Sequence, residues 1–129
     1  MRFFFDNNIS PKIAHALNCL VQPQHEVVHL RDRFAPGTSD ADWMTKLANE
    51  MDWVIISADT AISRNPHEVE AWKTAGHPIF FFKHSLLQQT FWQQASRLCH
   101  VFPDILKLAG RAKVGESFQI PVRGGIEGP

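Results

Sequence analysis

The sequence predicts a three-layer α/β/α fold, in which helices cover both faces of a central and mainly parallel sheet. Short apolar runs typical of buried strands alternate along the chain with segments whose apolar residues recur at helical spacing. Two of these runs, residues 1–5 and 53–57, are apolar on both alternating faces, as strands covered on both sides are. Such alternation is typical of βαβ units, so we expect parallel strands.

The first half of the chain is expected to contain three strands and two helices. Ser10 is a good N-cap and Pro11 suits the first position of a helix, so a helix follows the first strand. Residues 31–37 end in Pro-Gly and are expected to form a loop before the second helix. In chain order, the expected elements are a strand at 1–5, a helix at 11–20, a strand at 26–30, a helix at 40–50 and a strand at 53–57.

The second half is expected to continue the alternation. A helix over 66–75 is indicated by an N-cap residue, a proline at the first position and a glutamate at the capping-box position. A strand is expected at 78–82. A long helix over about 87–108 is expected to be interrupted near Pro103, because proline has no amide donor. A last strand over 117–122 contains a proline, which places it at the edge of the sheet.

The composition fits one domain. The chain has 129 residues, of which 44% are hydrophobic, which is enough for one core but hardly for two. We therefore expect a single domain over residues 1–122 and a flexible C-terminal tail over residues 123–129. The 13 Lys and Arg residues balance the 13 Asp and Glu residues, so the net charge neither indicates nor excludes RNA binding.

Cysteine usage and hydropathy indicate the compartment. Cys19 and Cys99 lie in apolar, helix-like contexts without metal-binding spacing, which favours buried thiols in a reducing compartment. No apolar run reaches the length of a membrane span, and Met1 leads directly into a strand. We expect a cytoplasmic protein with no membrane partner. The sequence leaves open whether the protein forms a homodimer. The tryptophans are expected in the core: Trp43, Trp53, Trp72 and Trp92.

Three aspartates are expected to converge at one edge of the sheet. Asp6 follows the first strand and Asp59 follows the strand over 53–57, and right-handed crossovers place the carboxyl ends of parallel strands on one edge. Asp40 begins the helix that leads into the second of these strands. Carboxylates this close repel one another, and Mg²⁺ is the natural cation to hold them. Such an ion activates water and stabilises charge on a phosphodiester, so we expect phosphodiester hydrolysis.

Each aspartate also has a purely structural interpretation. Asp6 fits a turn or a helix cap, Asp59 fits a plain turn, and Asp40 fits a favourable charge at a helix N-terminus. Ser39 and Asp42 resemble a capping box, so we leave Asp42 out of the site. Two apolar strands that both end in Asp favour the metal-site interpretation.

The order of these motifs resembles that of the PIN-domain nucleases, especially the compact PIN-like group related to VapC-type toxins. The motifs are Phe-Phe-Phe-Asp6, Gly37-Thr-Ser-Asp40-Ala-Asp-Trp43 and Val54-Ile-Ile-Ser-Ala-Asp59, and the resemblance spans residues 1–82. It implies a metal-dependent ribonuclease in which Asp6, Asp40 and Asp59 hold Mg²⁺ or Mn²⁺. It also implies that Ser57 supports the end of its strand and, as in many relatives, that the nuclease is a toxin held by an antitoxin protein.

The resemblance is incomplete at one acidic position. Longer PIN domains carry another acid on a helix between the first two motifs. Only Glu26 and Asp32 are available here, and Asp32, in the loop near Gly37, is the better substitute. The resemblance therefore does not imply a complete two-metal site.

Other polar residues beside the predicted edge are candidates for supporting roles. Asn7 and Asn8 directly follow Asp6 and could support the acidic site. The loops beside the acids are expected to contain three arginines, which could contact phosphates that flank the scissile bond. They are Arg31, Arg33 and Arg64. For any one of these arginines, simple solubility is an equally good explanation.

Two other functions stay open from the sequence. A phosphoreceiver domain is also doubly wound, and Asp6, Asp59 and Lys83 imitate its acids and lysine. In a receiver domain the lysine follows the fifth strand, two strands after the phosphoacceptor aspartate. Here Lys83 follows the very next strand after Asp59, so it comes one strand too early. The second alternative is an inactive PIN-like module that only binds a partner, and the three intact aspartates argue against it.

Overall fold

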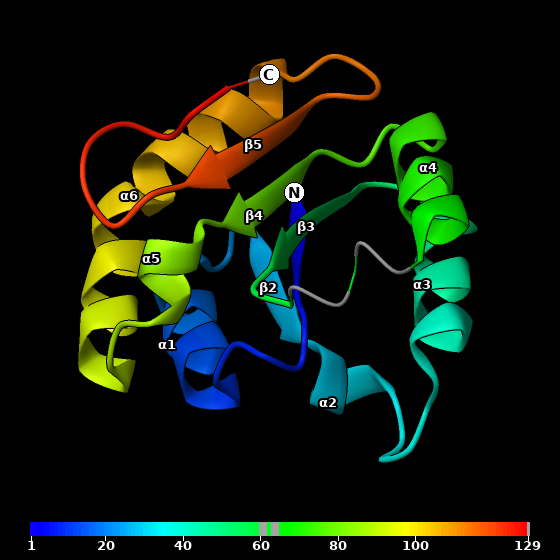
Figure 1. The fold of residues 1–129 in the computed structure, drawn as a ribbon, viewed down its shortest axis with the longest axis horizontal. Helices are drawn as coiled ribbons and strands as arrows, with labels where there is room; N and C mark the ends of the chain where they lie inside the picture. Colours follow the sequence, from blue (N-terminus) through cyan, green and yellow to red (C-terminus); the bar gives the residue numbers. More distant parts are fainter. Residues whose placement is uncertain (60–61, 63–64, 129) are drawn as a thin grey trace.

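Residues 1–59, 62 and 65–128 are described in the computed structural model, and they form three layers (Figure 1). The central layer is a five-stranded parallel sheet in the order β2-β1-β3-β4-β5. The strands are β1 (Arg2–Phe5), β2 (Glu26–His29), β3 (Trp53–Ser57), β4 (Ile79–Phe82) and β5 (Ser117–Ile120). The helices are α1 (Pro11–Val21), α2 (Leu30–Arg33), α3 (Asp40–Ala48), α4 (Pro66–Thr74), α5 (His84–Leu87) and α6 (Phe91–Arg111). The predicted three-layer α/β/α fold is confirmed.

Helices cover both faces of the sheet, as the apolar strands require. Helices α1, α5 and α6 lie on one face, and α3 and α4 lie on the other (Figure 1). In β1, Phe3 and Phe5 pack into the first of these two cores. Phe4 packs into the second, where its ring stacks on Trp43 with 5.5 Å between centroids. Because burying one such side chain contributes about 2 kcal/mol, β1 is anchored from both sides.

The pairing of β1 with β3 positions the predicted site. β1 has neighbours on both sides, β2 and β3, so it is an interior strand as predicted. Phe5 is in register with Ile56, and the Asp6 amide donates to the Ile56 carbonyl at 3.3 Å. The next residues along the two strands, Asp6 after β1 and Ser57 at the end of β3, therefore lie side by side.

The segment over 31–37, expected to be a loop, begins with the short helix α2. The His29 ring accepts from the Arg31 amide at 3.0 Å, and the Asp32 carboxylate accepts from the His29 amide at 2.9 Å. These two bonds form a capping box that starts a helical turn. The sequence does not predict this turn, because histidine is not a common N-cap residue.

The predicted long helix is broken at a different place. α6 continues through Pro103, and the break lies between α5 and α6, before Thr90. Thr90 and Gln93 form a capping box there, with bonds of 2.9 and 3.2 Å. The proline removes one amide donor, but buried residues on both sides of it hold the helix against the sheet. They are Leu98, Val101, Phe102 and Ile105.

Three exposed side chains were expected to be buried. Trp92 is 78% exposed, whereas the other three tryptophans are in the core as expected. Cys19 and Cys99 are also exposed, and both are free thiols. All three lie on α1 or α6, whose sheet-facing stripes are filled by other residues. Among the described residues, no helix is long and apolar enough to cross a membrane.

The C-terminal segment contacts the edge of the sheet. β5 is one of the two edge strands, as predicted, and it ends at Ile120, just before the proline on which that prediction rested. Beyond it, Glu127 and Gln119 exchange two backbone hydrogen bonds of 2.8 Å, and the Glu127 carboxylate pairs with Lys83 at 2.8 Å. These contacts tie the segment over 123–128 to β5 and β4. The division into a domain over 1–122 and a flexible tail stays a prediction.

Candidate active site

The Asp6 carboxylate is held by four hydrogen bonds at the carboxyl ends of β1 and β3. Its Oδ2 atom accepts from the Ser57 hydroxyl at 2.5 Å and from the Asp59 amide at 3.2 Å. Its Oδ1 atom accepts from the amides of Asn8 and Ala58 at 3.1 and 3.3 Å. Two backbone segments therefore fix this carboxylate, and the adjacency of Asp6 and Asp59 expected from parallel strands is present.

The surroundings of Asp6 make its negative charge costly. The residue is 1% exposed. Burial raises the pKa of the Asp6 carboxyl from 3.8 to about 6, although the hydrogen bonds from Ser57, Ala58 and Asn8 oppose the shift. The nearby charge of Asp59, which is half-buried, raises it further. An acid pair of this kind accumulates negative charge that a bound cation would relieve.

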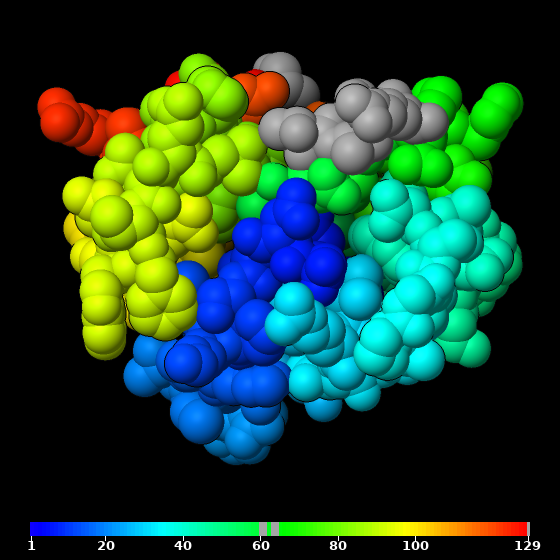
Figure 2. Space-filling view, turned by 60° about the horizontal axis from the view of Figure 1, so that its bottom comes forward, coloured from blue at the N-terminus to red at the C-terminus, as the bar shows by residue number. Residues whose placement is uncertain are grey.

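Asp40 lies on the same edge but apart from this pair. It is exposed at the first residue of α3, and its Oδ1 atom accepts from the indole N–H of Trp43 at 3.1 Å. It lines a cleft of about 540 Å³ that Asn7 and Arg31 also line. In Figure 2 the segment after β1 (blue) lies beside the segment leading into α3 (cyan). Within the described part of the chain, no three His, Cys, Asp or Glu side chains are grouped closely enough to hold a metal ion.

The donor set of Asp6 and Asp59 fits a hydrated hard cation. Both side chains offer carboxylate oxygens, which Mg²⁺ prefers, and Mg²⁺ binds proteins through one or two carboxylates while it keeps several waters. The Asp6 oxygens already accept two protein donors each, and Asp59 is the more exposed of the two residues. The arrangement does not form a cage of three carboxylates, because Asp40 stands apart.

The predicted supporting residues fall into two groups. Ser57 and Asn8 touch Asp6 directly, Ser57 through its hydroxyl and Asn8 through its backbone amide. The side chain of Asn7 contacts Arg31: its oxygen accepts a hydrogen bond from Arg31 Nε at 3.0 Å. Asp32, considered as a substitute acid, is engaged elsewhere: it caps α2 and pairs with the His15 ring at 2.9 Å.

The three candidate phosphate-binding arginines have different surroundings. Arg31 is exposed, lines the Asp40 cleft and is held by Asn7. Arg33 forms a two-pronged ion pair with Glu50, with both bonds at 2.8 Å, and lies over the Trp53 ring. Because Trp53 begins β3, this pair is at the end of the strand opposite Asp59. Arg64 lies outside the described residues.

A comparison with known families is decisive for the fold family. The family model described as "PIN like domain" matches residues 1–84. The chain belongs to the PIN-like domain family. The match covers about two thirds of the chain and includes Asp6, Asp40 and Asp59. No curated protein and no solved structure matches the chain significantly.

Membership in this family gives the site a general context. PIN domains are commonly nucleases and generally use divalent metal ions. The resemblance to PIN domains stated from the motifs is therefore confirmed, and the relation to VapC-type toxins stays a prediction. The region of this PIN-like domain that the family model matches ends just after β4. Helix α6 and strand β5 lie beyond it.

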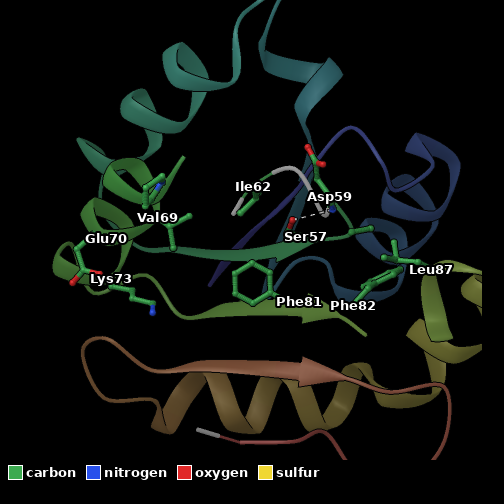
Figure 3. Close-up of a pocket in the computed structure, with 11 residues that line it drawn as sticks. Ser57, Asp59, Ile62, Val69, Glu70, Lys73, Phe81, Phe82 and Leu87 are labelled. Atoms are coloured by element: carbon green, nitrogen blue, oxygen red, sulfur yellow. Dashed lines mark hydrogen bonds between the residues drawn. The ribbon is translucent and has the colours of Figure 1, made fainter. Parts of the chain in front are cut away.

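A pocket beside Asp59 was not foreseen from the sequence. It lies between α4 and the ends of β3 and β4, has a volume of about 440 Å³, and has Phe81, Val69 and Lys73 in its wall (Figure 3). The three consecutive phenylalanines of β4 predicted a buried strand. Nothing in that run distinguishes Phe81, which is half-buried, from its buried neighbours. The position of α4, which leaves this ring partly uncovered, is a property of tertiary packing.

Proposed function

We propose that this PIN-like domain is a divalent-metal-dependent endoribonuclease that hydrolyses RNA phosphodiesters. The observation that carries the proposal is the pair of carboxylates, Asp6 and Asp59, at adjacent strand ends. In parallel α/β sheets, ligands bind outside the carboxyl ends of the strands. A fixed and buried acid next to a more accessible one fits a site for a cation and a phosphate.

The residues of the site have separate proposed roles. Asp59 and Asp6 would hold Mg²⁺ or Mn²⁺, which supplies an activated water and neutralises charge that develops on the phosphate. Ser57 fixes the Asp6 carboxylate through its hydroxyl, so that this acid keeps one orientation. Asp40 faces the neighbouring cleft and would complete the acidic edge from α3. Arg31, oriented by Asn7, offers donors to a phosphate of the RNA backbone.

We further propose that the nuclease is the toxin of a toxin–antitoxin pair. The support is the order of its three aspartate motifs, which resembles that of VapC-type toxins. An antitoxin would inhibit by covering the acidic edge, and an arginine of the antitoxin near Asp59 and Asp40 would suit its charge. Inhibition should then compete with metal and with RNA.

A cleavage assay with matched variants tests the nuclease function. Wild-type protein should cleave single-stranded RNA with Mg²⁺ or Mn²⁺ and lose this activity in EDTA. Asp59→Asn should abolish cleavage while it keeps the fold, because the amide keeps the volume but loses the charge. Asp42→Asn is the control, since Asp42 is an exposed acid of the same helix as Asp40. Equal cleavage by wild type and Asp59→Asn would exclude the assigned site. A wild type that binds RNA or a partner but never cleaves would indicate an inactive binding module.

The phosphoreceiver alternative is not favoured by the structure. The strand order is one that receiver domains also use, so topology alone does not separate the two. The lysine that imitates a receiver lysine, Lys83, is engaged by Glu127 of the C-terminal segment. No described contact joins it to Asp59, and the family match is to PIN-like domains.

A further inference from the structure

The pocket beside Asp59 is continuous with the proposed acidic site. Among the described residues, Ser57 and Asp59 form part of its wall, next to the apolar side chains of Ile62, Val69 and Phe81. Figure 3 shows the Phe81 ring below Ile62 and to one side of Asp59, with Lys73 reaching toward the ring from α4. One wall of this cavity is therefore acidic and most of the remainder is apolar.

The strand register fixes how close the aromatic ring is to the acids. Phe81 of β4 pairs directly with Ser57 of β3, the residue whose hydroxyl holds Asp6. Neighbouring strands in a sheet are about 4.8 Å apart. A chain whose phosphate lies at the Asp6–Asp59 pair would therefore bring an adjoining group to the ring of Phe81.

The chemistry of the wall fits a nucleobase. Every base has a flat π-face that stacks on an aromatic side chain, and single-stranded RNA is commonly recognised through such unstacked bases. The ring of Phe81 is half-buried, so part of it faces the cavity. Lys73 and Glu70, both in the wall, add a donor and an acceptor for the polar edge of a base. The volume of about 440 Å³ is in the range of small-ligand pockets.

We infer that this pocket binds an unstacked nucleobase of single-stranded RNA, next to the phosphate that is cleaved. The inference deepens the proposed nuclease function and rests on it. Phe81 would be the stacking residue, and Lys73 and Glu70 would contact the polar edge of the base. The pocket then contributes to the choice of cleavage site, because only a nucleotide whose base can leave its stack reaches the acids.

A binding experiment in EDTA tests the pocket separately from cleavage. Phe81→Leu keeps an apolar side chain but removes the aromatic face, and it should weaken the binding of a short single-stranded RNA about five- to hundredfold. Phe91→Leu is the matched control, because Phe91 is a partly exposed phenylalanine outside the pocket. It should change the affinity less than about twofold. Thermal unfolding of both variants checks the fold.

A wild-type titration followed by NMR needs no variant. Nucleoside 5′-monophosphates should shift the methyl resonances of Ile62, Val69 and Leu87, which line the pocket, and ribose 5-phosphate should not. If no nucleotide shifts these methyl resonances and Phe81→Leu binds RNA with wild-type affinity, the inference is overturned. The pocket would then be a site for a side chain of a partner protein. If wild type still cleaves RNA in that case, the nuclease proposal stands. A wild type that neither binds nor cleaves RNA overturns both.

Discussion

The buried carboxyl of Asp6 should make the stability of the protein fall as the pH rises from about 4 to about 7. Its pKa is about 6 in the folded chain and 3.8 in an unfolded reference. Because the folded pKa is raised, the contribution is complete below the unfolded pKa and is lost as the pH passes through the folded one. A difference of about 2 pKa units corresponds to about 3 kcal/mol of unfolding free energy.

The effect of Asp6 is measured as a difference between two proteins. Urea unfolding of wild type and of Asp6→Asn should be compared at several pH values, because His29 acts in the opposite direction: its burial lowers its pKa. The difference in unfolding free energy should change by about 2 kcal/mol from about pH 4 to 7, which is most of the full effect. The NH₂ group of the asparagine cannot accept the hydrogen bonds that Asp6 accepts, so Asp6→Asn should have a lower unfolding free energy at every pH. This loss does not depend on pH, because the amide does not titrate. A carboxyl ¹³C titration of Asp6 with a midpoint near 3.8 would refute the reasoning.

Three further predictions concern packing, an ion pair and RNA binding. Trp43→Ala should lower the unfolding free energy by about 3–5 kcal/mol, because the indole is buried against Phe4; a loss below about 1 kcal/mol in urea contradicts this. Glu50→Gln should cost about 2 kcal/mol at neutral pH. The Arg33 hydrogen bonds lower the pKa of Glu50 from 4.5 to about 2, so this cost should vanish as the pH falls through that range; a cost unchanged near pH 2 refutes the assignment. Arg31→Ala should reduce the slope of log affinity for RNA against log salt by about 1, and an unaltered slope means that Arg31 does not touch the backbone.

The strands and the acid pair could be predicted because they depend on local patterns and on one topological rule. Residues 1–5 and 53–57 are largely apolar on both faces, which is typical of strands in a parallel sheet covered by helices. The rule that parallel strands end at one edge then places Asp6 beside Asp59, as observed. Neither step needs information on how the helices pack.

The remaining features depend on packing between distant parts of the chain. The sequence placed Asp40 at the correct helix start, but its distance from the acid pair depends on how α3 seats Trp43 against Phe4. The partner of Arg33, Glu50, is separated from it by 17 residues and was not foreseen. Trp92 lies within a helix whose buried stripe is elsewhere, so its apolar character alone gave the wrong expectation.

The central claim is that Asp6 and Asp59 form a divalent-cation site, and calorimetric titration of Mg²⁺ and Mn²⁺ into the protein tests it most directly. Wild type should bind at a pH of about 7.5, where the Asp6 carboxyl is ionised. Asp59→Asn should weaken binding at least about tenfold, since it removes one of two carboxylates, and Asp42→Asn should bind like wild type. Undetectable binding to wild type, or equal binding to wild type and Asp59→Asn, would contradict the account.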